Sequence, residues 1–270
     1  MKKYRIGQLA KKMSVSLDFI RFYEEKGLIE SAVDRNNHYH YYDISQSEII
    51  QKIQEYRKLG FNVNETVDLL KRSDKTHMIE MYASRKATLL DNIKKSEYAV
   101  RYLSFLQTAL TTENGTWYVS RMPPLWFLPH TLNDDYLEDL SVQATYDAWS
   151  THVPLIYSID KWVIAADGTL DAIYHGRAVD CSVVADFGLQ PSSPFELYPE
   201  KRCLEYYMDH QHSPDFNLNP SIGLRTIQNA LDILKQKQFE IDGDVFVRLI
   251  ASYKENGRQN DRFVVYIPIK

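Results

Sequence analysis

Apolar positions near the start of the chain repeat with the period of a helix. Ile6, Leu9 and Met13 share one helical face. Residues 14–16 then have the composition of a turn, and Ile20 continues the pattern on a second short helix. The turn ends in a serine that can cap the second helix. This pattern predicts a helix-turn-helix unit.

A second helical pair is expected before residue 75. Ser45 and Glu48 have the form of a capping box, and the helix that they open is expected to end at Gly60. Asn62 and Glu65 make a similar start for the next helix.

A long helix is expected next, because residues 76–109 contain neither proline nor glycine. A heptad pattern fits this stretch, and seven of its ten seam positions are apolar. The pattern predicts a two-stranded coiled coil between two chains. We expect the long helix to dimerise in antiparallel fashion. Three polar seam residues leave an alternative open, in which the helix lies on its own C-terminal domain. The two seam positions hold Ile79, Lys86, Ile93, Val100 and Gln107, and Tyr82, Leu89, Ser96, Leu103 and Leu110.

The composition changes after Asn114 and Gly115 to β-branched and aromatic residues. Strand and helix patterns then follow in the order strand, helix, strands, and this order occurs twice. It predicts an internally duplicated α+β unit with a cleft between its halves. Strand-like runs lie at residues 116–121, 155–165, 173–185, 201–210, 244–253 and 262–269, and helical stretches at 137–153 and 222–239.

The fold class predicted from these patterns is a multidomain α+β protein. Residues 1–75 are expected to form a winged helix-turn-helix domain, residues 76–112 a coiled-coil dimerisation helix, and residues 115–270 a ligand-binding domain.

Charge is distributed unevenly over these domains. The 270 residues carry a net charge of -4, with 32 Lys and Arg against 36 Asp and Glu. Residues 1–75 hold 14 basic and 11 acidic residues, a net of +3, so the remainder holds 18 against 25, a net of -7. A basic head on an acidic body is expected where only the head meets phosphate.

Other function classes find little support in the sequence. Cys181 and Cys203 are far apart and form no CxxC pattern, which fits a reduced, cytoplasmic protein. The first residues are charged and soon enter a predicted helix, so they do not resemble a signal peptide, and no apolar stretch is long enough to span a membrane.

Neither the pair His38 and His40 nor the pair at residues 210 and 212 has a third metal ligand nearby. Nucleophile and P-loop motifs are missing, so we expect no enzyme, cofactor or metal.

Residues 4–70 resemble the DNA-binding domain of the MerR family of bacterial transcription regulators. The wing of that family usually reads Tyr-Arg-Tyr-Tyr, and His40 stands here in place of the arginine, which predicts a weaker phosphate contact. The motifs that carry the resemblance are Ile6-Gly7-Gln8-Leu9-Ala10, Val15-Ser16, Ile20-Arg21-Phe22-Tyr23-Glu24, Lys26-Gly27-Leu28-Ile29, Tyr39-His40-Tyr41-Tyr42, and Leu59-Gly60-Phe61 with Glu65.

The resemblance assigns the DNA contacts to the second helix, the wing and the end of the third helix. Cationic and hydroxyl-bearing side chains there can reach phosphates or base edges. The alternative is that the aromatic members belong to the core of a small helical domain. The predicted DNA-binding residues are Ser16, Phe19, Arg21, Tyr23, Tyr39, His40, Tyr41, Arg57 and Lys58.

Residues 115–270 resemble the gyrase-inhibitor-like effector domain of multidrug-binding members of the family. In those members a buried late-strand glutamate and several tyrosines hold the ligand, and here Val247 is expected at the glutamate position. Glu205 or Asp147 is then left to balance a cationic ligand, unless the ligand is not strongly cationic. Core packing is the alternative role for each aromatic ring. The predicted ligand-binding residues are Trp126, Tyr146, Asp147, Trp149, Trp162, Glu205, Tyr207 and Tyr253.

Together the resemblances imply a homodimeric, ligand-responsive activator that distorts double-stranded promoter DNA for the RNA polymerase holoenzyme. Its effector is expected to be a hydrophobic, cationic small molecule. Three alternatives remain open. The first is a sensor of metal or oxidation, which the absence of cysteine from residues 70–115 disfavours. The second is an enzyme whose head controls its own gene, and the third is a protein-docking module.

Overall fold

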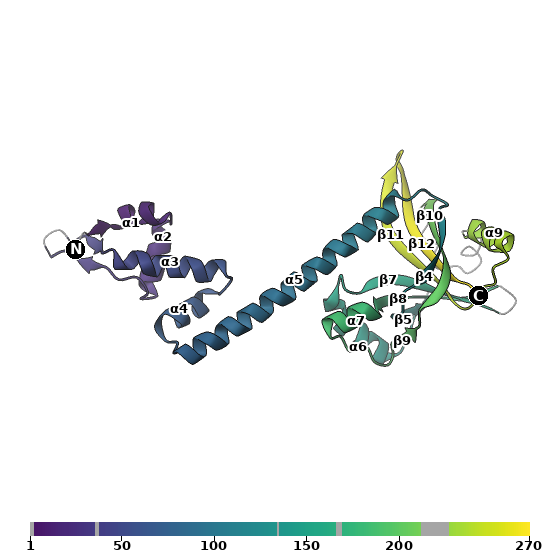
Figure 1. Ribbon diagram of the computed structural model, residues 1–270, viewed down its shortest axis with the longest axis horizontal. Helices are drawn as coiled ribbons and strands as arrows, with labels where there is room; N and C mark the ends of the chain where they lie inside the picture. The colour runs from purple at the N-terminus through teal and green to yellow at the C-terminus, as the bar shows by residue number, and fades with distance from the viewer. Residues whose placement is uncertain (1–2, 36–37, 134, 166–168, 212–226) are drawn as a thin grey trace. The chain divides into compact units, whose positions relative to one another are not determined.

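The computed structural model describes residues 3–35, 38–133, 135–165, 169–211 and 227–270 (Figure 1). The chain forms two compact units, Met1–Lys95 and Ser96–Lys270. The helix α5 (Lys75–Thr111) is continuous and supplies residues to both units. None of the helices in the described ranges combines the length and apolarity needed to cross a bilayer.

The N-terminal unit contains the predicted helix-turn-helix, the second helical pair and a small sheet, so its predicted architecture is confirmed. Leu9, Ile20, Tyr42, Ile50 and Ile53 form the centre of its core. The elements are α1 (Ile6–Met13), α2 (Leu17–Glu25), α3 (Ser45–Lys58) and α4 (Val63–Lys71), with strands β1 (Tyr4–Arg5), β2 (Ala32–Val33) and β3 (His40–Tyr42) in the sheet order β1-β3-β2.

Two of the three predicted helix caps are present. The Ser16 hydroxyl accepts a hydrogen bond of 3.0 Å from the backbone of the third residue of α2. Asn62 and Glu65 form the reciprocal capping box of α4, at 3.0 and 2.6 Å. The predicted box at residues 45–48 is wrong. Asp43 instead accepts a hydrogen bond of 2.8 Å from the first residue of α3, because a carboxylate two residues upstream already satisfies that amide.

The C-terminal unit is built on one antiparallel sheet of nine described strands, in the order β4-β10-β12-β11-β7-β8-β5-β6, with β9 paired to β5. The strands are β4 (Trp117–Met122), β5 (Leu125–Leu132), β6 (Asp135–Tyr136), β7 (Tyr157–Ile164), β8 (Leu170–Asp180), β9 (Glu196–Tyr198), β10 (Lys201–Gln211), β11 (Val245–Glu255) and β12 (Arg258–Pro268). The helices are α6 (Leu140–Trp149), the 3-10 helix η1 (Ser150–His152), α7 (Cys181–Phe187) and α9 (Gln228–Lys237).

The sheet contains the predicted duplication. The segment β5-α6-β7-β8 folds with β8 between β5 and β7, and the segment β10-α9-β11-β12 folds with β12 between β10 and β11. The halves join where β7 pairs with β11, for example Lys161 opposite Phe246. The sequence prediction missed β5, β6 and β9. It was also wrong to extend the strand at residues 173–185, since β8 ends at Asp180 and α7 follows. The predicted helix at 222–239 is described only from α9 onward.

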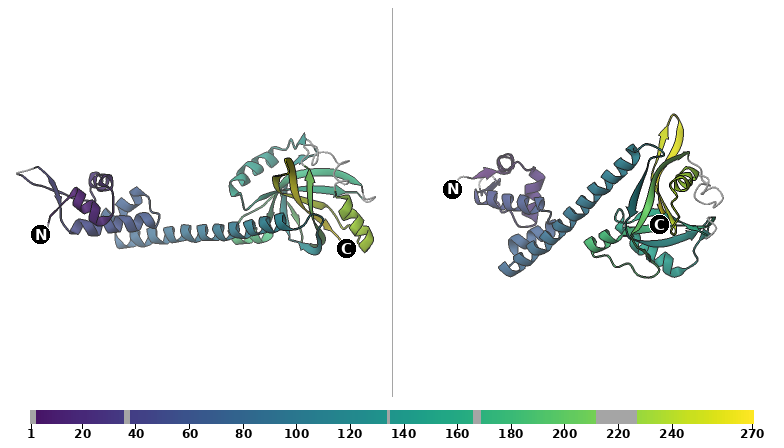
Figure 2. Two further views of the ribbon diagram at one scale, coloured as in Figure 1. Left: turned by 90° about the horizontal axis from the view of Figure 1, so that it is seen from above. Right: turned by 45° about the vertical axis from the view of Figure 1, so that its right-hand side comes forward.

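Alternating side chains give the sheet two different faces. On one face Trp162, Leu204 and Val247 pack with Ala230 and Leu234 of α9. In the ribbon views the helix α9 lies along this face of the sheet (Figure 2). The other face carries residues one position along each strand, and the last turns of α5 pack against it. There Ala109 of α5 joins a buried cluster with Tyr207 and Val264. This second face is called the α5 face.

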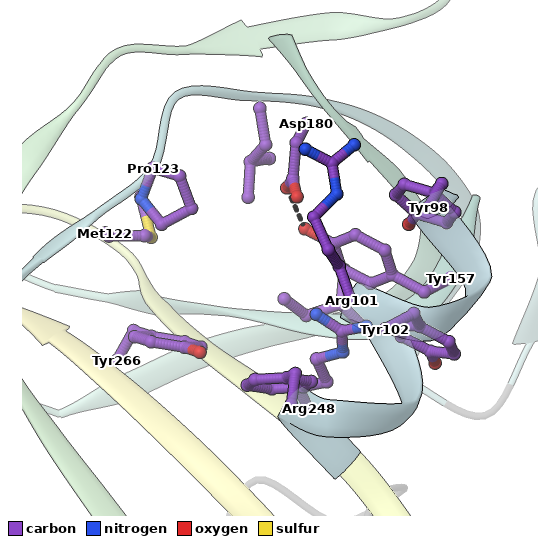
Figure 3. Close-up of a pocket in the computed structure, with 12 residues that line it drawn as sticks. Tyr98, Arg101, Tyr102, Met122, Pro123, Tyr157, Asp180, Arg248 and Tyr266 are labelled. Carbon is purple, nitrogen blue, oxygen red and sulfur yellow. Dashed lines mark hydrogen bonds between the residues drawn. The ribbon is translucent and has the colours of Figure 1, made fainter. Parts of the chain in front are cut away.

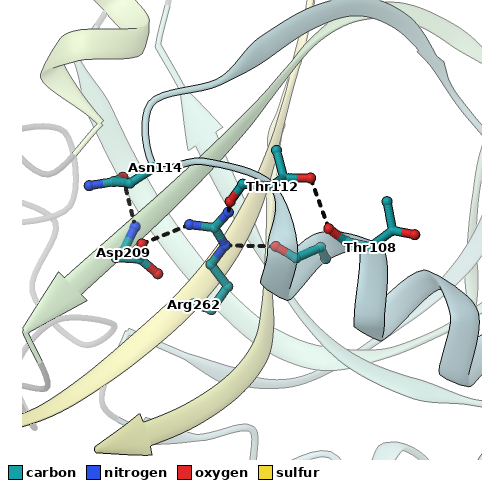
Figure 4. A network of polar contacts seen from close by, with 6 residues as sticks. Thr108, Thr112, Asn114, Asp209 and Arg262 are labelled. Carbon is teal, nitrogen blue, oxygen red and sulfur yellow. Dashed lines mark hydrogen bonds and ion pairs between the residues drawn. The ribbon is translucent and has the colours of Figure 1, made fainter. Parts of the chain in front are cut away.

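Arg262 of β12 connects the C-terminal end of α5 to the sheet by hydrogen bonds (Figure 4). Its buried guanidinium donates a hydrogen bond of 2.9 Å to the carbonyl of Ala109 and a second to the carbonyl of Thr112. It also pairs with Asp209 at 2.8 Å. The last carbonyls of a helix lack partners within the helix, so Arg262 satisfies them and complements the helix dipole.

Arg262→Gln is expected to lower the free energy of unfolding of the C-terminal unit by about 3 kcal/mol, because Asp209 and the α5 carbonyls would lose their partner. All four tryptophans lie in this unit, so urea denaturation followed by tryptophan fluorescence measures the change. The matched control is Arg258→Gln at the exposed start of the same strand, expected to change stability by less than about 0.5 kcal/mol. Equal stability of the two variants would contradict the anchoring role.

Candidate functional site

A groove in the N-terminal unit lies between the start of α1, the helix α2 and the wing strand β3. Its volume is about 660 Å³, and most of its charged side chains are basic or can become so. Arg5 lies over the ring of Tyr39, with 4.8 Å between the guanidinium carbon and the ring centroid. The charged and histidine residues of its lining are Arg5, Arg21, Glu24, His38 and His40.

Glu24, the acidic member of this lining, holds the wing to α2. It accepts hydrogen bonds from the hydroxyls of Ser31, at 2.5 Å, and Tyr42, at 3.0 Å. Burial and Glu24 together raise the pKa of Tyr42 to about 12, so its phenol stays neutral and can donate. His40 lies 3.5 Å from Glu24 and 2.7 Å from Ser31. Because Glu24 is engaged within the protein, the groove offers cations and donors to an anionic partner.

A second site lies within the C-terminal unit, between α5 and the α5 face of the sheet (Figure 3). The cavity has a volume of about 310 Å³ and is mostly lined by apolar and aromatic side chains. The helix contributes Tyr98, Arg101, Tyr102 and Phe105, and the strands and their ends contribute Met122, Pro123, Leu125, Tyr157, Ile159, Asp180, Arg248 and Tyr266. A concave apolar site with a few polar groups is the usual form of a small-molecule site.

Three charged side chains line this cavity. Arg101 is largely exposed and lies 3.9 Å from Asp186 outside the lining. Asp180 accepts a hydrogen bond of 2.6 Å from the Tyr157 hydroxyl. Arg248 is 7% exposed, and its guanidinium carbon lies 3.5 Å from the centre of the Tyr157 ring. The lining thus holds two guanidinium groups and one carboxylate that is already hydrogen-bonded.

The tyrosines around the cavity are held in their neutral form. Burial, followed by the charge of Asp180, raises the pKa of Tyr98 to about 12. The same two causes raise the pKa of Tyr157 well above its ordinary value. Burial is also the main cause that raises the pKa of Tyr266. Neutral phenols keep their hydrogens, and each is a hydrogen-bond donor near neutral pH.

Residues 4–73 match the family described as MerR HTH family regulatory protein. Among curated proteins, the chain is similar to the HTH-type transcriptional regulator ZntR of Escherichia coli strain K12. The two are 30% identical over 112 residues, which cover 41% of this chain and 78% of that relative. The chain belongs to the MerR family of DNA-binding transcription regulators.

Two further likenesses of this MerR-family protein are more limited. It is 37% identical over 68 residues to the Mercuric resistance operon regulatory protein of Bacillus cereus, covering 25% of this chain and 52% of the relative. A solved structure described as a cryo-EM structure of an EcmrR–DNA complex in EcmrR-RPo aligns over 99% of both chains, at 14% identity and a TM-score of 0.37.

Three of the nine predicted DNA-binding residues of this MerR-family protein line the groove, namely Arg21, Tyr39 and His40. Tyr23 was predicted to contact DNA, but its side chain does not face solvent. It is 3% exposed and belongs to the core, where Phe19 packs on it at 4.8 Å between ring centroids. Ser16 serves as the cap of α2. The others lie on the surface or half-buried outside the groove lining, and they are Tyr41, Arg57 and Lys58.

None of the eight predicted ligand-binding residues lines the cavity of the MerR-family protein. Trp162 is fully buried in the α9 core, so its ring cannot contact a ligand. Trp126, Tyr146 and Trp149 pack in a cluster between α6, α7 and the sheet. Asp147 is exposed and accepts a hydrogen bond of 2.9 Å from a neighbouring glutamine of α6.

The other three predicted ligand residues lie on β10 and β11. Glu205 and Tyr207 both lie on the α5 face, and the Tyr207 hydroxyl donates a hydrogen bond to Glu205. Tyr253 lies toward the β11-β12 hairpin. Val247, which the resemblance places at the position of the family's late-strand glutamate, does not line the cavity. It faces the α9 core, and Arg248, one residue later, lines the cavity because successive strand residues point to opposite faces.

The residues that the sequence prediction missed do leave a signal. Tyr98, Tyr102 and Phe105 follow one another at intervals of four and three residues, so they form one helical stripe. This stripe lies away from the heptad seam and faces the sheet of its own chain. The alternative considered for the long helix, packing on its own C-terminal domain, therefore holds for these last turns.

Cysteine and histidine form no evident metal site in the described ranges. No group of three or more His, Cys, Asp and Glu residues there could hold a metal ion. Cys203 is buried and Cys181 half-buried, and both are free thiols. The predicted histidine pair at residues 210 and 212 cannot be assessed, because residue 212 lies outside the described residues.

Arg21→Ala is expected to weaken binding to a duplex selected for tight binding by roughly tenfold, because an exposed arginine of the groove would no longer meet DNA. If Arg21 contacts a phosphate, the slope of log affinity against log salt also falls by about 0.9. Fluorescence anisotropy over a salt series measures both. Arg258→Ala, in the other unit, is the control, and equal affinities for the two variants would remove Arg21 from the contact surface.

Proposed function

We propose that this MerR-family regulator is a homodimer that activates transcription when a hydrophobic compound enters the cavity under α5. Its two heads would bind the half-sites of a pseudo-palindrome and distort promoter DNA so that RNA polymerase can use it. The observation that carries the proposal is that one continuous helix, α5, lines the cavity with Tyr98, Tyr102 and Phe105 and also contains the predicted dimer seam.

The exposure of the heptad seam supports the dimer. All seven apolar seam residues are exposed on the single chain, and Ile93 is 53% exposed. A stripe of large apolar side chains on a solvent-facing helix favours a partner. A second copy fits that stripe best, because the same seam then faces itself across a twofold axis. The seven residues are Ile79, Tyr82, Leu89, Ile93, Val100, Leu103 and Leu110.

A hydrophobic effector is supported by the cavity itself, whose lining consists mainly of aromatic and aliphatic side chains. The positive charge expected on this compound is disfavoured by the charges of the lining. Glu205 lies outside the lining, and the described lining has two arginines against Asp180.

Sensing is favoured over turnover by the same lining. Among its described residues there is no serine, threonine, cysteine, histidine or lysine, and its carboxylate, Asp180, accepts the hydrogen of a tyrosine whose pKa is raised well above its ordinary value. Binding of a compound in this cavity can shift α5 only if the compound prefers one conformation of the chain over another.

The test begins with selection of bound sequences from random duplexes by the purified full-length protein. Cell-free transcription is then measured from templates that carry the selected site between the two promoter elements. The DNA spacer between these elements has the optimal length in one template and is longer in the other. We expect a pseudo-palindromic site, and a rise in transcription on the extended spacer only, because untwisting helps only misaligned elements. Binding without sequence preference, or equal effects on both spacers, would contradict the proposed mechanism.

Ile93→Glu is expected to raise the dissociation constant of the dimer on the order of a hundredfold, because each chain would place a carboxylate in the apolar seam. Thr88→Glu adds the same charge to an exposed position of α5 outside the seam and is expected to leave the dimer intact. Sedimentation equilibrium of the two variants measures the difference. A dimer that tolerates both changes would place the subunit contact elsewhere.

A further inference from the structure

Three cations are buried on the α5 face of the sheet, and only two of them are neutralised. Lys161 pairs with Glu196 at 3.0 Å and donates a hydrogen bond of 2.8 Å to the hydroxyl of Tyr198. Arg262 pairs with Asp209 at 2.8 Å. Arg248 is equally buried, yet its Nη2 atom has no hydrogen-bond partner and no carboxylate pairs with it within the described part of the chain.

Aromatic rings hold the guanidinium of Arg248 in place. Its central carbon lies 3.5 Å from the centre of the Tyr157 ring, 4.8 Å from that of Phe105 and 5.4 Å from that of Tyr102. Such rings attract a cation through their faces, but they do not accept the in-plane N–H groups. An arginine cannot lose its charge in a protein, so this desolvated cation retains donors that the protein leaves unmet.

We propose that the cavity binds an aromatic compound that carries an oxyanion, such as a carboxylate or sulfonate, with Arg248 as its counter-charge. The proposal rests on the cavity being the effector site of the proposed function. The planar fork of a guanidinium matches a carboxylate with two parallel hydrogen bonds, and the rings around it supply an apolar surface for the rest of the compound.

The other charged groups around the cavity agree with an anionic ligand. Arg101 adds a second cation to the lining. Asp180 already accepts the Tyr157 hydrogen, and Glu205 accepts that of Tyr207, so both carboxylates are engaged within the protein. The Tyr98 hydroxyl makes only a long hydrogen bond of 3.4 Å, to the carbonyl of Pro154, and this hydroxyl can turn to donate to an oxyanion.

The binding mode can be tested with three naphthalene probes of similar size and different charge: 2-naphthoate, 2-naphthamide and 2-naphthylmethylammonium. Each is titrated into the full-length protein by calorimetry, in wild type and in Arg248→Gln, Asp180→Asn and Arg258→Gln. Arg258→Gln makes the same charge change at an exposed residue away from the cavity. Circular dichroism melts establish that each variant is folded.

We expect 2-naphthoate to bind most tightly, and its affinity to fall roughly ten- to a hundredfold in Arg248→Gln only, the size of a lost charged hydrogen-bonded pair. Preference for the ammonium probe, with loss in Asp180→Asn, would overturn the anion assignment and leave the effector cavity standing. Equal binding of naphthoate and naphthamide, unchanged in Arg248→Gln, would likewise remove Arg248 as the counter-charge. If none of the probes binds, both the anion assignment and the effector role of this cavity are overturned.

Discussion

The anchoring of the α5 C-terminus by Arg262 is the interaction on which the cavity depends. A helix end presents unsatisfied carbonyls, and here a buried guanidinium takes up those of Ala109 and Thr112 while Asp209 balances its charge. With this end fixed on the sheet, the stripe of Tyr98, Tyr102 and Phe105 faces the strands of the same chain. The cavity is thus a consequence of where one helix is capped.

That capping gives α5 two different apolar faces. One faces the sheet of its own chain and contains buried residues such as Tyr98 and Ala109. The other holds the heptad seam and remains exposed on the single chain. A ligand in the cavity touches the first face, and the proposed partner subunit covers the second. Because a helix is stiff along its axis, a tilt imposed on one face also moves the other, which is the physical basis of the proposed coupling.

The sequence predicted best where local rules decide the structure. The caps Ser16 and Asn62 and the duplicated strand-helix-strand order follow from short-range chemistry and periodicity. It failed where long-range packing decides. Trp162 and Tyr146 are aromatic residues that would suit a ligand cage. In the structure Trp162 is buried in the α9 core, and Tyr146 of α6 is half-buried against the cluster between α6, α7 and the sheet. The alternation of β11 also matters, because Val247 faces the α9 core whereas Arg248, the next residue, lines the cavity.

Because of Arg248, the empty cavity and the cavity that holds an oxyanion differ in free energy by more than an apolar lining alone would produce. An unpaired, desolvated charge disfavours the closed cavity when it is empty, whereas a bound oxyanion removes that penalty. The same compound would gain little in a conformation where Arg248 reaches water, since water already satisfies its donors there. The compound therefore binds more tightly to the conformation in which α5 covers Arg248. A ligand can switch a regulator only through such a difference in affinity between two conformations.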